Sequence, residues 1–432
     1  MAGERREATF QQLLDEGLLE IGDGYRAQNN ELGGTGPVFL RAGHVTDSHI
    51  DFTGVEHFQD HLAVKVRSKM SKVGDTIITT KGNSTGRTSF VTDRLPPFVY
   101  SPHLSYWRSR DAEKLCGGFL RYWSQGVEFI EQLSGMKAST DMAPYLSLTD
   151  QRRLSITLPP LTEQKALAAV LGALDDKIEL NRRMNVTLEA IARALFQSWF
   201  VDFDPVRAKL DGRDPVCLDS ATAALFPASF IETTADHIPY GWRVGSIYEV
   251  ANVIYGAPFA SSLFNSEKLG KPLIRIRDLP NESPAIFTTE VHSKGYLLKP
   301  GDIAVGMDGE FRAYLWAGVE SWLNQRVCVF APKPGYSAAF VRNSIIAPLA
   351  QVEATETATT VIHLGKNDID RFTVIIPDAP VAEAFKRQCQ PWYDQIVANK
   401  QQSRTLANLR DTLLPKLLSG ELSVANSNIE SL

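Results

Sequence analysis

The chain is poor in residues that build metal centres and covalent crosslinks. It contains four cysteines among 432 residues, and Cys116, Cys217, Cys328 and Cys389 lie far apart without a C-x-x-C pair. This distribution argues against a zinc site or a disulfide framework and fits a reducing compartment. The eight histidines are scattered without the spacing of metal ligands. We therefore predict no bound metal and no cofactor.

Long apolar runs are also lacking. No stretch approaches the length of a membrane span, and the first residues, Met-Ala-Gly-Glu-Arg-Arg-Glu-Ala, lack the apolar core of a signal peptide. The composition, with 44% hydrophobic and 22% charged residues, is ordinary for a globular protein. We predict a soluble, cytoplasmic protein without a membrane segment, and its length suggests two or three domains.

Neither an excess of positive charge nor a familiar catalytic motif is present. A formal charge of -5 argues against a protein that coats nucleic acid, but not against a sequence reader whose basic residues are local. There is no G-x-x-x-x-G-K-[ST] phosphate loop, no clear G-x-G-x-x-G after a strand, no N-P-P-Y or D-P-P-Y cluster and no Ser/His/Asp or Cys/His signature. These absences predict a non-catalytic chain.

What the chain does contain is an internal repeat. A segment that starts at Pro159 recurs 218 positions later, at Pro377, without a gap over its best-matched part. The other matched pairs are Ala166 and Ala384, Asp176 and Asp394, Ile178 and Ile396, Asn181 and Asn399, Thr187 and Thr405, Leu188 and Leu406, and Leu195 and Leu413. Because duplicated modules usually present two similar surfaces, we expect a partner that is read at two places.

The repeated segment has the pattern of a long helix. No proline interrupts the chain between Pro160 and Pro205. The apolar residues there form a stripe along one helix face, which we call the seam, and where the seam is unbroken its members are alternately three and four positions apart. This seam contains Leu167, Leu171, Leu174, Ile178, Leu188, Leu195 and Trp199, and its second copy contains Phe385, Cys389, Trp392, Ile396, Leu406, Leu413 and Leu417. A helix over residues 163–200 would be about 55 Å long. In the second copy, Pro391 predicts a kink or a later start.

Both copies interrupt the seam at an asparagine, Asn181 in the first and Asn399 in the second. A polar residue exposed where the stripe drifts outward would explain either one alone. Two at matched positions predict that antiparallel helices bring them face to face about a pseudo-two-fold axis, because mid-helix positions then meet. Since a buried asparagine pair lowers stability but fixes register, we hypothesise that Asn181 and Asn399 set the helix register.

The segments before the two helices repeat more weakly and have the pattern of short strands. Residues 72–78 (Lys-Val-Gly-Asp-Thr-Ile-Ile) align with 299–305 (Lys-Pro-Gly-Asp-Ile-Ala-Val), and both indicate a turn that leads into a buried strand. Residues 38–41 align with 272–275, and 98–103 with 321–326. Each module is therefore predicted to be α+β with a curved sheet. The predicted domains are a first module (1–157), a central helix (158–200), an irregular connector (201–240), a second module (241–376) and a C-terminal helix with a tail (377–432).

Basic residues gather locally in the first module. Residues 51–110 contain nine basic and five acidic side chains, a local charge of +4. The loop 81–87 (Lys-Gly-Asn-Ser-Thr-Gly-Arg) offers donors suited to phosphate oxygens and base edges, while its counterpart 308–312 differs in charge and shape. A solvated turn explains any one such loop, but equivalent loops that differ favour two different targets. The predicted DNA-binding residues are Lys65, Arg67, Lys69, Lys81, Asn83, Ser84, Thr85, Arg87, His103, Arg275, Arg277, Asp308, Arg312, Asn324, Gln325 and Arg326.

Several motifs over nearly the whole chain resemble the DNA-specificity subunits of type I restriction–modification enzymes. The central motifs are residues 158–164 (Leu-Pro-Pro-Leu-Thr-Glu-Gln), 174–183 (Leu-Asp-Asp-Lys-Ile-Glu-Leu-Asn-Arg-Arg) and 194–207 (Ala-Leu-Phe-Gln-Ser-Trp-Phe-Val-Asp-Phe-Asp-Pro-Val-Arg). Residues 409–421 resemble that family's C-terminal ending, and residues 18–25 and 238–242 resemble its module entries. The similarity departs at Pro391 and in the polar stretch 399–404.

This resemblance implies two target-recognition modules, each reading one half of a split sequence in double-stranded DNA, and paired helices that set the spacing. It implies a subunit without activity of its own. Such a subunit holds two methyltransferase subunits, which use S-adenosylmethionine to methylate adenine, and through them recruits ATP-driven restriction subunits. The helix faces with Arg182, Arg183, Glu189 and Arg193 are candidate docking surfaces, although any solvated helix face has this composition.

Two other classes of protein remain open on the sequence. A bivalent coiled-coil scaffold for a non-DNA ligand, such as a glycan or a protein, would lack the steep salt dependence that phosphate contacts give to duplex binding. An enzyme with an unrecognised site would transfer methyl groups as the purified chain alone.

Overall fold

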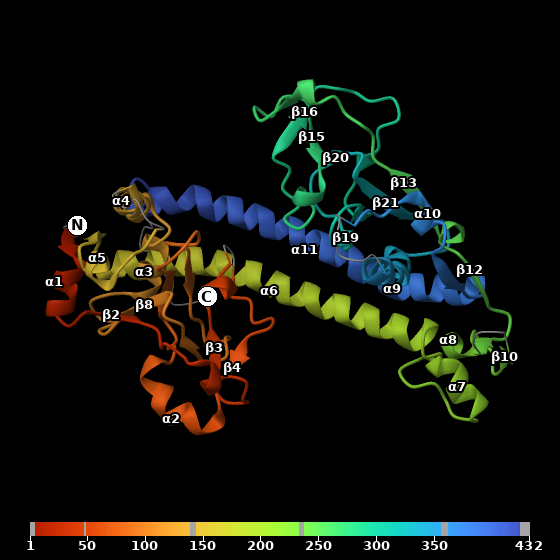
Figure 1. The fold of residues 1–432 in the computed structure, drawn as a ribbon, viewed down its shortest axis with the longest axis horizontal. Coiled ribbons are helices and arrows are strands. Elements are labelled where there is room, and N and C mark those ends of the chain that lie inside the picture. Colours follow the sequence, from red (N-terminus) through yellow and green to blue (C-terminus); the bar gives the residue numbers. More distant parts are fainter. Residues whose placement is uncertain (1–4, 47–48, 139–143, 233–236, 356–361, 424–432) are drawn as a thin grey trace. The chain divides into compact units, whose positions relative to one another are not determined.

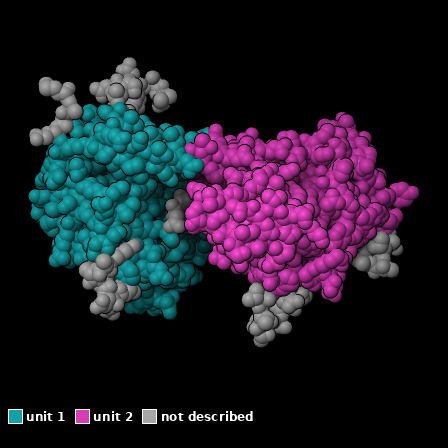
Figure 2. Space-filling model, turned by 90° about the horizontal axis from the view of Figure 1, so that it is seen from above, with its two compact units in different colours: residues 1–177, 406–432 teal, residues 178–405 magenta. Residues whose placement is uncertain are grey.

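The computed structural model describes residues 5–46, 49–138, 144–232, 237–355 and 362–423. It divides into two compact units, residues 1–177 with 406–432 (unit 1) and residues 178–405 (unit 2), which Figure 2 shows in separate colours. The unit boundaries fall inside the two long helices, α6 (Leu161–Phe200) and α11 (Ala379–Ser419). Each unit therefore contains a stretch of both helices.

Unit 1 is built on a four-stranded antiparallel sheet in the order β2-β8-β5-β6, with a smaller β4-β3-β7 sheet and a β1-β9 pair (Figure 1). Its strands are β1 (Arg6–Thr9), β2 (Leu19–Asp23), β3 (Val38–Leu40), β4 (Glu56–His57), β5 (Thr76–Thr79), β6 (Thr88–Phe90), β7 (Phe98–Tyr100), β8 (Leu104–Ser109) and β9 (Ser155–Leu158). Its shorter helices are α1 (Phe10–Asp15), α2 (Ala63–Val66), α3 (Gly117–Trp123), α4 (Val127–Ala138) and α5 (Leu148–Arg152). The rings of Phe10, Trp107 and Trp123 join α1 and α3 to the large sheet in one buried core.

Unit 2 contains a four-stranded antiparallel sheet in the order β13-β21-β18-β19, a five-stranded sheet in the order β14-β16-β15-β20-β17, and the pairs β10-β11 and β12-β22 (Figure 1). Its strands are β10 (Phe230–Glu232), β11 (His237–Pro239), β12 (Arg243–Ser246), β13 (Ala251–Tyr255), β14 (Phe264–Asn265), β15 (Lys271–Ile274), β16 (Ile286–Thr288), β17 (Leu297–Leu298), β18 (Ile303–Gly306), β19 (Ala313–Leu315), β20 (Ser321–Leu323), β21 (Val327–Pro332) and β22 (Thr373–Ile376). Its shorter helices are α7 (Asp204–Leu210), α8 (Ser220–Ala224), α9 (Ala338–Thr355) and α10 (Lys366–Ile369).

The two modules share one topology, which confirms the predicted repeat and the α+β class. In the large sheets, β2-β8-β5-β6 corresponds strand by strand to β13-β21-β18-β19, and the parallel pair β3–β7 corresponds to β15–β20. The aligned Lys-x-Gly-Asp turns also match. The carboxylate of Asp75 accepts from the Lys72 backbone N–H at 2.8 Å, as that of Asp302 does from Lys299. The strands that follow these turns, β5 and β18, are buried along their whole length.

Inside each unit the two long helices run antiparallel. In unit 2, the ring of Trp199 lies 5.7 Å from that of Phe385, while the Asn181 side-chain nitrogen lies 2.9 Å from the Gln402 side-chain oxygen. In unit 1, the Arg410 guanidinium lies 2.7 Å from the Asp175 carboxylate. Seam residues such as Leu167, Leu171, Trp199, Phe385 and Ile396 are buried, which confirms the helical period derived from the sequence.

The second long helix is more regular than predicted. It begins at Ala379, with Pro380 in the first turn, where no backbone N–H is needed. The later start expected from Pro391 is wrong, because Pro391 lies well inside the helix. The preceding turns are anchored by Phe385 and Cys389, which are fully buried, so packing outweighs the hydrogen bond that the proline removes.

The connector over residues 201–240 is also more regular than expected, since it contains α7, α8 and β10. Short helices of this kind carry little periodic signal, so the sequence pattern alone indicated an irregular segment. Along the ranges that the structure describes, no helix is both long enough and apolar enough to cross a membrane.

Candidate nucleic-acid interface

Most of the predicted loops leave the large sheet of unit 1 at the same end. The antiparallel registers place Asp23 opposite Ser105, Thr79 opposite Leu104, and Ile78 opposite Thr88. The end of β5 and the starts of β6 and β8 therefore lie side by side. The loop that carries both Lys81 and Arg87 and the loop that carries His103 emerge there, although the two loops are separate in sequence.

A short backbone ladder holds the loop after β5. The Thr80 N–H donates to the His103 carbonyl at 2.9 Å, and the Leu146 N–H donates to the Thr80 carbonyl at 2.9 Å. The Gly82 N–H donates to the Pro144 carbonyl at 3.1 Å, and the backbones of Lys81 and Tyr145 form an antiparallel β-bridge. We call this arrangement the loop ladder. It brings together Lys81, His103 and Tyr145, whose side chains are all exposed.

Unit 2 contains the same loop ladder with different side chains. The Met307 N–H donates to the Arg326 carbonyl at 2.9 Å, and the Leu364 N–H donates to the Met307 carbonyl at 2.8 Å. The Gly309 N–H donates to the Ile362 carbonyl at 3.0 Å, and the backbones of Asp308 and His363 form an antiparallel β-bridge. Asp308, Arg326 and His363 thus occupy the positions that Lys81, His103 and Tyr145 occupy in unit 1.

The two ladders differ in charge and in side-chain contacts. Asp308 accepts from the Arg326 guanidinium at 3.0 Å, and its carboxylate lies 2.7 Å from His363 Nδ1, so these three side chains converge. In the corresponding place of unit 1, neither Lys81 nor His103 makes a side-chain ion pair with another described residue. The first ladder therefore presents cationic and aromatic groups, whereas the second presents an organised acid–base cluster.

Tyr145 and His363 were not among the residues predicted from the sequence. They approach the loop through backbone bonds from residues that lie about 60 positions further along the chain. A signal was nevertheless present, because Tyr145 and His363 are separated by the same 218 positions as the repeated helices.

A close backbone approach fixes each neighbouring loop at the sheet end. A Cβ added to Gly24 would lie 2.0 Å from the Ser101 carbonyl oxygen, and one added to Gly256 would lie 2.0 Å from that of Asn324. Any other residue would push the 101–103 or 324–326 loop away. These two glycines are equivalent in the repeat and position the loops from which His103 and Arg326 project.

Three predicted residues of the 81–87 loop hold its shape. Thr85 is buried, and its hydroxyl oxygen lies 2.7 Å from the Gly82 carbonyl and 2.9 Å from the Pro144 carbonyl, so its one proton is shared between these two acceptors. The Ser84 carbonyl accepts from the Arg87 N–H at 2.9 Å, and the Arg87 guanidinium donates to the Val45 carbonyl at 2.9 Å. Among the loop's predicted contacts, the exposed side chains of Lys81 and Asn83 are the best placed to meet a ligand.

The basic segment formed by α2 and the following 3-10 helix (Arg67–Lys69) is partly neutralised by carboxylates. Lys65 lies 2.7 Å from Glu31, and Lys69 lies 2.6 Å from Asp23. The ammonium of Lys65 lowers the pKa of the Glu31 carboxyl to about 2. Arg67 is exposed and makes no ion pair within the described ranges. The local excess of charge is therefore smaller at this surface than residue counting suggests.

The remaining predicted residues of unit 2 surround its loop ladder. The Asn324 N–H donates to the Ile274 carbonyl at 3.1 Å, which places the Arg275 segment beside the 324–326 loop. The guanidinium of Arg275 pairs with Asp278 at 3.1 Å, and that of Arg312 pairs with Glu353 at 3.0 Å. Arg277 and Gln325 are exposed.

The paired asparagines lie in contact at the middle of the helices in unit 2. Asn181 is completely buried, and Asn399 is 3% exposed. The Asn181 side-chain nitrogen lies 3.3 Å from the Asn399 carbonyl and 2.9 Å from Gln402 Oε1, while the Asn399 side-chain nitrogen donates to Asn185 Oδ1 at 2.9 Å. The two side chains therefore belong to one polar cluster but bond to neighbouring groups rather than to each other.

Comparison with known proteins points to one family. Residues 24–190 and 239–389 match the family described as "Type I restriction modification DNA specificity domain". The chain is 25% identical over 444 residues to the specificity subunit of the type I restriction enzyme HindI from Haemophilus influenzae, covering 89% of this chain and 94% of that one. It is 26% identical over 309 residues to the MjaIX specificity subunit from Methanocaldococcus jannaschii, covering 69% and 66%. The crystal structure of a type I restriction–modification S subunit from M. genitalium shares the fold, with a TM-score of 0.56, 14% identity and 96% coverage of both chains.

Proposed function

The chain belongs to the family of type I restriction–modification DNA specificity proteins, and from this premise we propose how its two modules read DNA. Its function is that of a sequence-specificity subunit, and the alternative of a scaffold for a non-DNA ligand finds no support in the comparisons. We propose that each module, within the domain limits predicted above, reads one half of a split duplex target. The two long helices set the distance between the halves.

One observation carries this proposal: the same backbone ladder recurs in both modules with different side chains. Lys81, His103 and Tyr145 stand in the first, and Asp308, Arg326 and His363 stand in the second. A fixed backbone that presents variable side chains is what two readers of different sequences need. We propose that these six residues are the main specificity determinants.

The chemistry of the second ladder suits a G·C base pair. An arginine fork pairs with the O6 and N7 acceptors of guanine, and a carboxylate accepts from the N4 amino group of cytosine. Asp308 holds the guanidinium of Arg326 at 3.0 Å and so pre-orients the fork before DNA arrives. Exposed cations such as Arg67 and Arg277 suit phosphate contacts, which position the protein without reading sequence.

Catalysis is proposed to lie in partner subunits. In this proposal, two methyltransferase subunits dock on exposed helix faces, and ATP-dependent restriction subunits join through them. Arg183 and Arg193 are exposed on α6 and suit such docking. Glu189 is turned instead toward its own module, where it lies 3.1 Å from the Arg342 guanidinium, and Arg182 pairs with Glu179 on its own helix.

The proposal is tested by module-specific substitutions in the complex with the cognate methyltransferase. Arg326→Ala should relax the preferred base at one position of one half-site and cut methylation of the full motif by about 10- to 100-fold, because a bidentate base contact contributes about 1–3 kcal/mol. Lys81→Ala should affect only the other half-site. Arg213→Ala is the matched control, since Arg213 is an exposed arginine paired with Asp211 in the connector. Equal effects of Arg326→Ala and Arg213→Ala would refute the assignment.

A further inference from the structure

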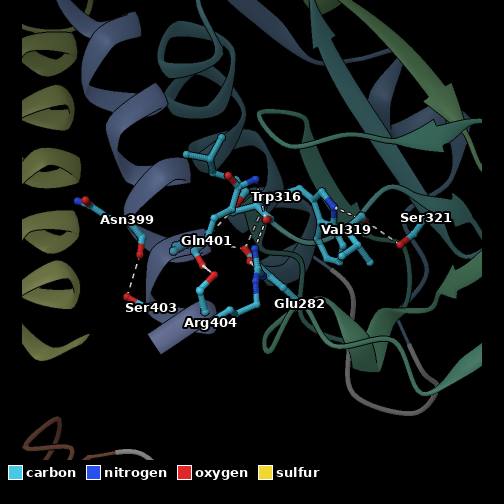
Figure 3. Close-up of polar contacts among 12 residues, drawn as sticks. Glu282, Trp316, Val319, Ser321, Asn399, Gln401, Ser403 and Arg404 are labelled. Atoms are coloured by element: carbon cyan, nitrogen blue, oxygen red, sulfur yellow. Dashed lines mark hydrogen bonds and ion pairs between the residues drawn. The ribbon is translucent and has the colours of Figure 1, made fainter. Parts of the chain in front are cut away.

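The polar stretch 399–404 of α11 has two contact faces within unit 2. Its first face meets α6 through Asn399 and Gln402, which contact Asn181. Its second face meets loops of the recognition module through Gln401 and Arg404 (Figure 3). Lys400 contacts the same loops. The break in the apolar seam is therefore a polar junction rather than an irregular piece of helix.

Glu282 is the centre of the second face. Its carboxylate lies 2.8 Å from Lys400 Nζ and 2.7 Å from Arg404 Nη1, and it accepts from the Ala317 N–H at 3.3 Å. The Ala317 carbonyl accepts in turn from Arg404 and from Gln401 (Figure 3). Lys400 also donates to the Leu315 carbonyl at 3.1 Å. We call Glu282, Ala317, Lys400 and Arg404 the Glu282 clamp.

The geometry of Glu282 shows that its surroundings determine its position strongly. Its side chain is only 8% exposed, and a carboxylate removed from water in this way is tolerated only when it is paired and hydrogen-bonded. Its backbone has a φ of 51°, in the left-handed region that non-glycine residues rarely adopt. Such a conformation persists where the surrounding contacts over-determine it.

The clamp is not part of the internal repeat. At the offset of 218, Lys400 corresponds to Arg182 and Arg404 corresponds to Val186. Val186 carries no charge and is 59% exposed, so the pair of cations one helical turn apart occurs in the second copy alone. The Glu282 clamp is therefore specific to the second module.

The second module is also held to α11 at another point. The rings of Phe340 on α9 and Phe200 on α6 pack against Phe385 near the start of α11. Phe385 and Lys400 are 15 positions apart, or about 22 Å along a helix. Apolar packing has little directionality, so this cluster fixes the angle of the module weakly even with the Arg342–Glu189 ion pair beside it. A second, charged anchor at this distance fixes the angle.

We propose that Glu282 is a positioning residue that fixes the orientation of the second module on α11 and thereby sets the base-pair spacing at which its half-site is read. This inference rests on the proposed function. The sheet end that carries Arg326 moves with the module, so a pivot about the aromatic cluster displaces it along the DNA. A displacement of about 3.4 Å, one base step, is enough to change the accepted spacing.

The test uses the full complex with the cognate methyltransferase and a plasmid library that carries the wild-type half-sites separated by spacers up to two base pairs shorter or longer. The wild-type complex should methylate one spacer length. The complex with Glu282→Gln should also methylate plasmids whose spacer is one base pair shorter or longer, at no less than about one tenth of its rate on the original spacer. The half-site sequences that it recognises should not change. Glu320→Gln is the matched control, because Glu320 forms a Lys271 pair of the same 2.8 Å length on the module surface.

A purely structural role would lower methylation at every spacer without broadening the profile, and that result, or an unchanged profile, overturns the inference. If Glu282→Gln does not fold, Glu282→Gln combined with Lys400→Met removes charge from both sides of the clamp, and it should show the same broadening. Failure of the wild-type complex to methylate any split motif would refute the proposed function itself. If the wild-type complex methylates a single spacer length and the Glu282 variants accept only that same length, the result would refute only the role of Glu282.

Discussion

Replacing Asn181 with leucine should stabilise the protein, whereas the same change at Asn399 should not. Asn181 is completely buried, and its side-chain oxygen has no hydrogen-bond partner among the described residues. Its nitrogen lies within 3.3 Å of three acceptors, of which Gln402 Oε1 is the closest at 2.9 Å. Asn399 differs, because its oxygen accepts from Gln395 at 2.7 Å and its nitrogen donates to Asn185 at 2.9 Å.

The magnitudes follow from these contacts. An unsatisfied buried polar group costs about 1–3 kcal/mol, and an ordinary hydrogen bond contributes about 0.5–1.5 kcal/mol. Asn181→Leu removes one unsatisfied oxygen and one good hydrogen bond, for a net gain of about 1 kcal/mol. Asn399→Leu removes two good hydrogen bonds and no unsatisfied atom, for a net loss of about 1–3 kcal/mol.

Differential scanning calorimetry of the purified chain measures both changes. A gain of about 1 kcal/mol raises the melting temperature by roughly 2–4 °C for a folding unit of 150–250 residues, and unit 2 is of this size. The expected order is Asn181→Leu above wild type, with Asn399→Leu below wild type. A melting temperature for Asn181→Leu that lies several degrees below wild type would refute the argument from the unpaired oxygen.

Two further predictions concern the sheet ends and the thiols. Gly24→Ala and Gly256→Ala should each destabilise the chain by about 1–3 kcal/mol, measured by urea unfolding, because the new Cβ would meet a carbonyl oxygen at 2.0 Å; equal stability would contradict the close approach. In the native chain at pH 8, iodoacetamide should label the exposed Cys217 but not Cys328 or Cys389, since burial raises the pKa of both thiols to about 12. Labelling of all three at similar rates by mass spectrometry would contradict that burial.

The parts of the fold with a regular period could be predicted from the sequence. The seam containing Leu167, Leu171 and Trp199 predicted α6 almost to its ends, because a long apolar stripe with steps of three and four residues is typical of a helix that packs lengthwise. The Lys-x-Gly-Asp turns at Asp75 and Asp302 located the buried strands β5 and β18, because each aspartate satisfies its own turn.

The candidate site could be predicted only in part, since loop composition does not show where a side chain points. Thr85 and Arg87 had suitable chemistry for DNA, but their donors bond to carbonyls of the loop and of Val45. Tyr145 and His363 lacked a local signal because a long-range ladder brings them to the surface. Tertiary contacts of this kind are invisible to a reading of neighbouring residues.

The most direct test of the central claim is to map adenine methylation in DNA from cells that express this chain with its cognate methyltransferase. We predict methylation at a single motif made of two different half-sites with a fixed spacer, and its loss when this chain is omitted. Two different half-sites are expected because the two loop ladders carry different side chains, with Lys81 in one and Asp308 in the other. A methylation pattern that does not depend on this chain, or a motif with one undivided site, would contradict the account.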